Sequence, residues 1–91
     1  MLMLFLIYSN AVDDEMVEIV KRHAGGYTKF LGVQGEGSGE PNLGTHIWPG
    51  INNCIMVAVD KGKRKFIEGE ISTIKKKFPG IGIHSYALQL K

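Results

Sequence analysis

Two segments of strand length are apolar on both sides, and they restrict the folds open to this chain. Residues 2–8 read LMLFLIY and residues 54–59 read CIMVAV. Successive side chains of a strand point to opposite faces of its sheet, so both faces of such strands have to be covered. The sequence therefore predicts a sheet whose inner strands are buried on two sides.

The segment after the first strand has the pattern of an amphipathic helix. In AVDDEMVEIVKRHAGG, acidic residues fill the expected first turn and basic residues the last, as the helix dipole favours. Either Ser9 or Asn10 can cap this helix, and Gly25 with Gly26 can end it. The stripe at helical spacing consists of Val12, Met16, Ile19, Val20 and His23. We expect this stripe to face the sheet.

A second helix and two further strands complete the pattern. A helix is predicted over residues 61–77, stopped by Pro79 and Gly80. Strands are predicted over residues 27–34 and 83–90. The buried stripe of the second helix is predicted to be Ile67, Ile71, Ile74 and Phe78. The numerous lysines of this helix are expected on its solvated side.

The order of these elements, βαββαβ, predicts an α+β ferredoxin-like domain over residues 1–91: an antiparallel sheet with both helices on one face. The other face would then expose the second set of apolar side chains from the inner strands. Soluble monomers rarely expose an apolar patch of more than a few hundred Å². We therefore expect an obligate homo-oligomer in which sheets of different subunits pack together.

Residues 35–53, GEGSGEPNLGTHIWPGINN, form a long segment without strand or helix periodicity. It contains the only tryptophan of the chain, Trp48. Loops longer than about 12–15 residues are uncommon in small domains and are usually functional or disordered. This loop is therefore the first place to look for a binding site.

The segment GYTKFLGVQGEGSGE, residues 26–40, resembles the PII-like superfamily, which includes the PII nitrogen-regulatory signal proteins and the CutA proteins. In PII proteins a strand runs into a glycine-punctuated loop base, and Thr28, Gly35 and Gly37 stand at matching places. The resemblance implies a ferredoxin-like homotrimer in which the sheets close a central core. It also implies that residues 35–53 correspond to the T-loop, which touches partner proteins and reports the ligand state.

The same resemblance implies a ligand site between neighbouring subunits, with the threonine and the glycines at its base. The resemblance assigns Thr28, Gly35 and Gly37 to this site. The chemistry of the loop residues adds Glu36, Glu40 and His46 as polar contacts and Trp48 as an aromatic one, which completes the predicted ligand-binding set. PII proteins also carry a phosphate-binding lysine in the turn after the second helix, and a basic segment near the end. Here residues 79–82 read PGIG and no basic segment follows Leu90, so half of a nucleotide site is matched.

Three interpretations of the loop stay open. In the first, the protein is a signalling or regulatory sensor or adaptor that binds a small ligand, with an adenine nucleotide as one candidate. In the second, it is a CutA-like trimer in which His46 binds a divalent metal together with Glu36 or Glu40. In the third, the loop is structural and Trp48 locks the trimer. The sequence names neither the ligand nor the partner protein.

Other classes of function are disfavoured. No nucleophile with a base and an orienting group is recognisable, so we do not expect an enzyme. The inner strands lack the exposed aromatic pair that stacks RNA bases, and the net charge of +2 is too small to indicate a polyanionic partner. The single Cys54 fits a reducing cytoplasm, and residues 1–8 resemble neither a signal peptide nor a membrane span.

Overall fold

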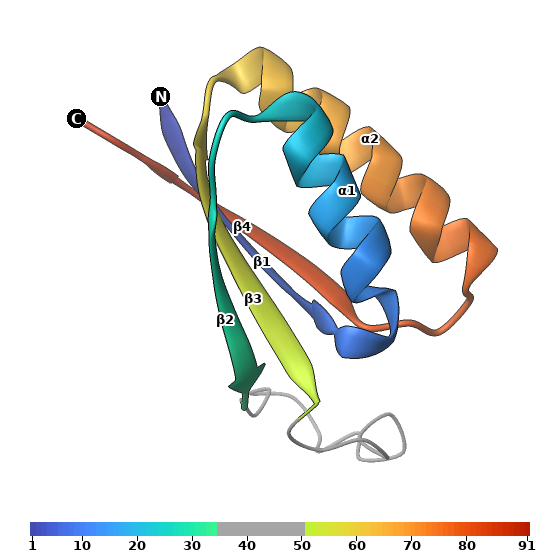
Figure 1. Ribbon diagram of the computed structural model, residues 1–91. Coiled ribbons are helices and arrows are strands. Elements are labelled where there is room, and N and C mark those ends of the chain that lie inside the picture. The colour runs from blue at the N-terminus through green and yellow to red at the C-terminus, as the bar shows by residue number, and fades with distance from the viewer. Residues whose placement is uncertain (35–50) are drawn as a thin grey trace.

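The structure, a computed structural model, describes residues 1–34 and 51–91 and forms a four-stranded sheet with two helices on one face (Figure 1). Within these residues the strand order is β2-β3-β1-β4, and every neighbouring pair is antiparallel. The elements are β1 (Leu2–Ser9), the 3-10 turn η1 (Asn10–Val12), α1 (Asp13–His23), β2 (Thr28–Val33), β3 (Asn52–Val59), α2 (Lys61–Lys77) and β4 (Ile83–Gln89). The predicted ferredoxin-like order is confirmed.

The core lies between the sheet and the helices. Alternate side chains of the two inner strands point into it, and Leu4, Leu6 and Ile55 have no exposed surface. Most residues of the expected helical stripes meet them, because Met16, Val20 and Ile67 are equally buried. His23, which was predicted in the stripe of α1, is instead partly exposed and contacts Glu70 and Phe66 of α2. We call this side of the sheet the covered face. Phe78, predicted in the buried stripe of α2, is only partly buried.

Side-chain caps mark the start of η1 and of α2. The Ser9 hydroxyl accepts a hydrogen bond from the Ala11 N–H at 3.2 Å, and this caps η1. The helix α1 begins one turn later, at Asp13. Its N-cap residue, Val12, makes no side-chain cap hydrogen bond, so the expected capping of this helix by Ser9 or Asn10 is not found. The Asp60 carboxylate caps α2 by accepting from the Lys63 N–H at 2.8 Å. Each cap satisfies a backbone donor that has no partner within its own helix.

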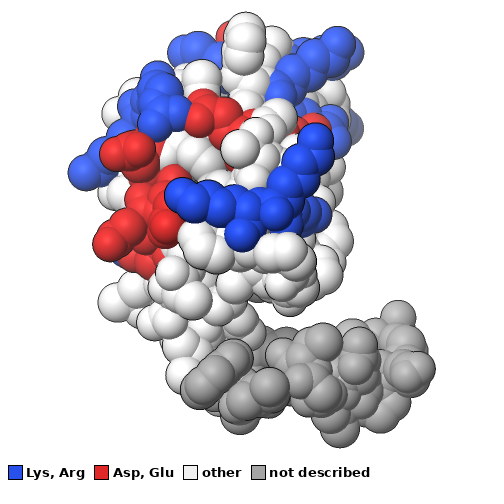
Figure 2. Space-filling model, turned by 90° about the vertical axis from the view of Figure 1, so that its right-hand side faces the viewer, with Lys and Arg blue, Asp and Glu red and all other residues white. Residues whose placement is uncertain are grey.

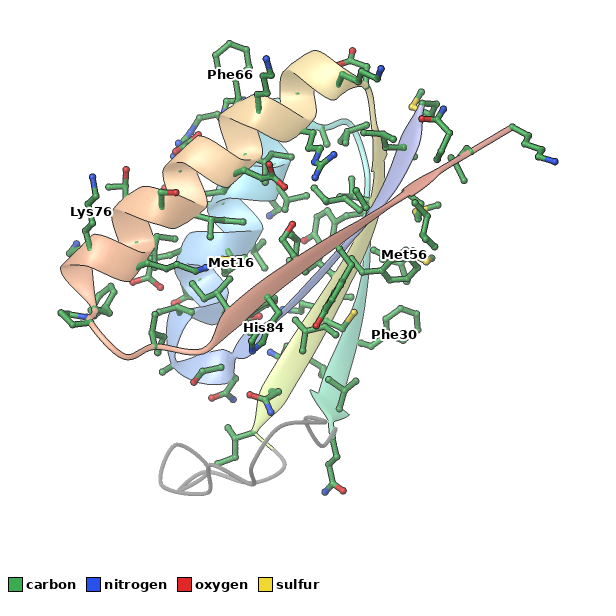
Figure 3. The ribbon with its side chains drawn as sticks, turned by 180° about the vertical axis from the view of Figure 1, so that it is seen from behind. Met16, Phe30, Met56, Phe66, Lys76 and His84 are labelled. Atoms are coloured by element: carbon green, nitrogen blue, oxygen red, sulfur yellow. The ribbon has the colours of Figure 1, made fainter. Side chains whose placement is uncertain are left out.

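The other side of the sheet, which we call the open face, carries apolar side chains with no helix over them. The register pairs Phe5 of β1 with Met56 of β3 and with Tyr86 of β4, so these three side chains share this face. In Figure 3, Met56 and Phe30 project away from the helices. Tyr86 and Leu88 are each 57% exposed. The predicted uncovered apolar face is thus present in the single chain.

Neither α1 nor α2, the helices within the described residues, is long and apolar enough to cross a membrane.

Candidate functional site

The described residues next to the long loop meet at one end of the sheet, which we call the loop base. Here β2 ends at Val33, and the chain returns at Ile51 to start β3. The Asn10 N–H donates to the carbonyl of Ile51 at 2.9 Å, and the Ser9 N–H donates to that of Gly82 at 3.0 Å. The loop base is therefore tied to η1 and to the turn between α2 and β4 (Figure 1).

A β-bulge shapes the β2 side of the loop base. Phe30 pairs with Cys54 and Val33 with Asn52, so two residues of β2 stand opposite one of β3. Gly32, inside the bulge, has a φ of 65°, a conformation that glycine adopts without a Cβ clash. Bulges bend a strand and change the course of the chain beyond them. This one sets the direction in which the chain leaves the sheet toward residue 35.

A partly buried polar cluster supports the bulge from the covered face. Asn53 is 6% exposed, and its side-chain oxygen accepts a hydrogen bond from the Gly32 N–H at 3.2 Å. Its side-chain nitrogen donates to Asp13 Oδ1 at 3.0 Å. Asp13 also accepts from the Tyr8 hydroxyl at 2.7 Å and from Lys29 Nζ at 2.9 Å. We call these four residues, Tyr8, Asp13, Lys29 and Asn53, the Asp13 cluster; it joins β1, α1, β2 and β3.

The cluster holds Asp13 as a carboxylate. Burial alone would raise the pKa of Asp13, but the hydrogen bonds from Lys29, Tyr8 and Asn53 outweigh it, and the pKa lies below its usual value. Burial raises the pKa of the Tyr8 hydroxyl well above its usual range, and the hydrogen bond to Asp13 adds to this. With its oxygens occupied by three donors, Asp13 orients the loop base and is poorly placed to act as a general base.

Of the predicted ligand-binding residues, only Thr28 lies within the described part of the chain. It begins β2 and lies on the open face opposite Met56. Val33 ends the same strand, and a rise of about 3.3 Å per residue separates the two by roughly 16 Å. Gly35, Glu36, Gly37, Glu40, His46 and Trp48 lie outside the described residues. Thr28 and Val33, where the described chain approaches the loop, therefore lie at opposite ends of β2.

Two features of the loop base differ from the sequence expectation. The loop was predicted to reach residue 53, whereas Asn52 and Asn53 belong to β3. A buried asparagine fits in this strand because Asp13 and Gly32 satisfy its amide. Sequence reasoning also missed the Asp13 cluster. The one available signal was a tyrosine at the end of an apolar strand, since a buried hydroxyl needs a partner.

Away from the loop base, the polar side chains of the described residues do not form a deep binding site. A hollow of about 280 Å³ between α2 and β4 is lined partly by Glu68, Lys75 and His84. Another, of about 440 Å³, lies beside α1 and Lys29. Both are wide open, unlike the clefts that enclose most of a small ligand. Within residues 1–34 and 51–91, no three His, Cys, Asp or Glu side chains gather as a metal site requires.

Comparison with solved structures identifies the fold. One similar structure is CPII, a nitrogen regulatory PII-like protein from Thiomonas intermedia K12, seen bound to ADP, AMP and bicarbonate. It superimposes with a TM-score of 0.68 over 99% of this chain and 91% of its own, at 15% sequence identity. A PII-like signalling protein of Thermus thermophilus gives a TM-score of 0.64 over 96% of this chain and 83% of its own, at 22% identity. The chain thus has the ferredoxin-like α+β fold, in the form found in PII-like proteins.

The fold by itself does not assign an activity. A de novo designed protein, Foldit4, also matches, with a TM-score of 0.54 over 99% of this chain and 97% of its own, at 13% identity. No protein-family model and no curated protein matches the sequence. Function therefore has to be argued from the surfaces and the site.

Proposed function

We propose that this chain is a PII-like regulatory protein: a homotrimeric sensor or adaptor, not an enzyme, that binds a small ligand between subunits. The observation that carries the proposal is the apolar open face, in a chain that shares its fold over nearly its whole length with PII-like proteins. The predicted loop, which ends before β3, engages a partner protein, and the ligand sets its conformation. The single cysteine, Cys54, fits a reducing cytoplasm as the place of action.

The open face gives the reason for assembly. Its side chains come from all four strands, and the largest of them stay partly exposed in the single chain. Covering apolar area stabilises by about 25 cal/mol per Å², so packing sheet against sheet is favourable. The helices occupy the opposite side of the sheet (Figure 1), and they do not obstruct such packing. Three copies are proposed from the resemblance to PII proteins.

The ligand is proposed to lie along the exposed edge strand β2. Thr28 marks one end of this strand and the loop base the other. A nucleotide is elongated, with a base at one end and phosphates at the other, and it suits two contact points that are well separated. CPII was seen bound to ADP and AMP, and an adenine nucleotide is accordingly our first candidate. The predicted contacts of Gly35, Glu36, Gly37, Glu40, His46 and Trp48 belong to the same site.

Titration calorimetry of the purified chain against ADP, AMP and ATP tests this proposal, with the molecular mass measured by light scattering. We expect a trimer that binds at least one of these nucleotides in the micromolar range. Thr28→Ala should weaken the binding, whereas the control Thr73→Ala, on the exposed side of α2, should not. A trimer that binds none of the three would overturn the nucleotide assignment. Binding of Zn²⁺, Cu²⁺ or Ni²⁺ in its place would favour the CutA-like alternative.

A further inference from the structure

The outer side of α2 carries a concentration of positive charge that the net charge of the chain conceals. The helix contains seven Lys or Arg residues and two Glu, a net charge of +5, whereas the remaining residues contain four Lys or Arg and seven Asp or Glu, a net charge of −3. The chain is therefore strongly polarised although its total is only +2. Figure 2 looks onto this helical side, where blue side chains project from the surface; most of the red ones gather at the left, and a few lie between the blue ones.

The carboxylates of α2 do not neutralise its lysines. Glu68 accepts from Arg64 at 3.0 Å, and Glu70 is engaged by Arg22 and His23 of α1. None of the six lysines of α2 forms an ion pair within the part of the chain that the structure describes. All six are exposed: Lys61, Lys63, Lys65, Lys75, Lys76 and Lys77. With a rise of about 1.5 Å per residue, they extend over roughly 24 Å of helix.

A large aromatic side chain stands among these lysines. Phe66 is 64% exposed, and one side of its ring is stacked on His23 with 5.6 Å between centroids and 6° between planes. His23 is in turn held by Glu70, so the aromatic ring rests on an ordered support. In Figure 3, Phe66 and Lys76 both project from the side of α2 that faces away from the sheet. The other side of the Phe66 ring is available for contact.

We propose that the outer side of α2 docks onto an anionic lipid surface, with the lysines among the headgroups and Phe66 at the boundary of the acyl chains. Exposed lysines of an amphipathic helix attract anionic lipid, and an aromatic residue on the same helix suits the interface. A helix is convex and its lysines radiate from it. A fluid headgroup layer can adapt to such a surface, whereas a protein partner would need a matching groove.

This docking is compatible with assembly through the open face. The helices lie on the covered side of the sheet, and α2 stays at the surface when open faces pack together (Figure 1). The docking does not depend on ligand binding by the loop. Nucleotide titration and membrane binding can therefore succeed or fail separately.

Vesicle flotation of the full chain tests the proposal. The vesicles consist of phosphatidylcholine alone or with about 30% phosphatidylserine, at about 0.1 M and 0.5 M NaCl. We expect binding only to the vesicles with phosphatidylserine, and less of it at the higher salt. No binding at the lower salt, or equal binding to phosphatidylcholine alone, would overturn the proposal. So would binding to soluble polyglutamate through the same lysines without binding to vesicles.

Two matched double variants separate local charge from total charge. Lys65→Gln with Lys76→Gln removes two lysines from the proposed surface, and Lys21→Gln with Lys91→Gln removes two from elsewhere. At about fivefold per lysine, the first pair should lower the partition coefficient by about 25-fold. The second pair should stay close to the unaltered protein; an equal loss in both pairs would contradict docking through α2.

Phe66→Ser tests the aromatic contact. This side chain is exposed, so the fold should survive, which circular dichroism can verify. We expect a severalfold lower partition coefficient at both salt concentrations, because loss of apolar contact is not screened by ions. An unchanged partition coefficient would contradict the placement of Phe66 at the membrane.

Discussion

The two faces of the sheet are built from neighbouring residues of the same strands, yet helices cover one face and leave the other exposed. On β3, Ile55 points to the covered face and has no exposed surface, whereas the next residue, Met56, points to the open face and stays partly exposed. On β1, Leu6 and Ile7 show the same contrast. The hydrophobicity of a strand residue thus does not by itself predict whether the helices of its own chain cover it.

The largest effect should come from the covered face. Ile55→Ala leaves a cavity between the sheet and the helices, and it should lower the free energy of unfolding by about 2–5 kcal/mol. Urea denaturation followed by circular dichroism measures this change. The slope of the transition should stay the same, since the variant unfolds from the same fold. A loss well under 1 kcal/mol would mean that the helices do not hold this face as tightly as its burial indicates.

The adjacent residue should affect assembly before it affects the fold. Met56→Lys places a charge on the open face, where it would be buried without a partner if the sheets of several copies pack together. We expect association to weaken by at least about tenfold, or ~1.4 kcal/mol, with the helical content retained. Light scattering over a dilution series gives the oligomeric state. If the assembly persists unchanged, the open face is not the subunit interface.

The covered face has one polar region, the Asp13 cluster, and its contribution should depend on pH. The pKa of Asp13 is lower in the folded chain than its usual value, so its stabilisation is complete above the ordinary carboxyl pKa and is lost as the pH falls through the lowered one. Asp13→Asn keeps the shape, and it should cost about 1 kcal/mol at neutral pH. Urea denaturation between neutral and acidic pH should show a smaller decrease for the variant than for the unaltered chain.

The elements could be predicted from sequence because their signals are local. The second helix was expected over residues 61–77, and the structure gives Lys61–Lys77, where a cap and a proline mark its limits. The bulge and the Asp13 cluster had no such signal. Asn53 and Asp13 are 40 residues apart in the chain, and no periodicity relates them. Their contact depends on the register of β3 against its neighbours.

The prediction of the ligand-binding residues was incomplete for a different reason. Thr28 was grouped with the loop glycines, although a strand of known rise separates them. Strand geometry alone could have shown that Thr28 and the start of the loop lie at opposite ends of β2. The resemblance to PII proteins indicated which residues to consider, and the structure adds the position of Thr28 on β2.

The smallest effect is expected outside both faces, in the middle of α2. Gly69 has no atom within 4 Å of the place where a Cβ would lie, so Gly69→Ala should raise the free energy of unfolding by about 0.5–1 kcal/mol through reduced backbone freedom. Gly80 is also unhindered, but its φ of 87° strains any other residue, and Gly80→Ala should be destabilising. Thermal denaturation of the pair should give shifts of opposite sign. A destabilising Gly69→Ala that also lowers the oligomeric mass would mean that another copy packs against α2, and that the helical layer takes part in the interface assigned to the open face.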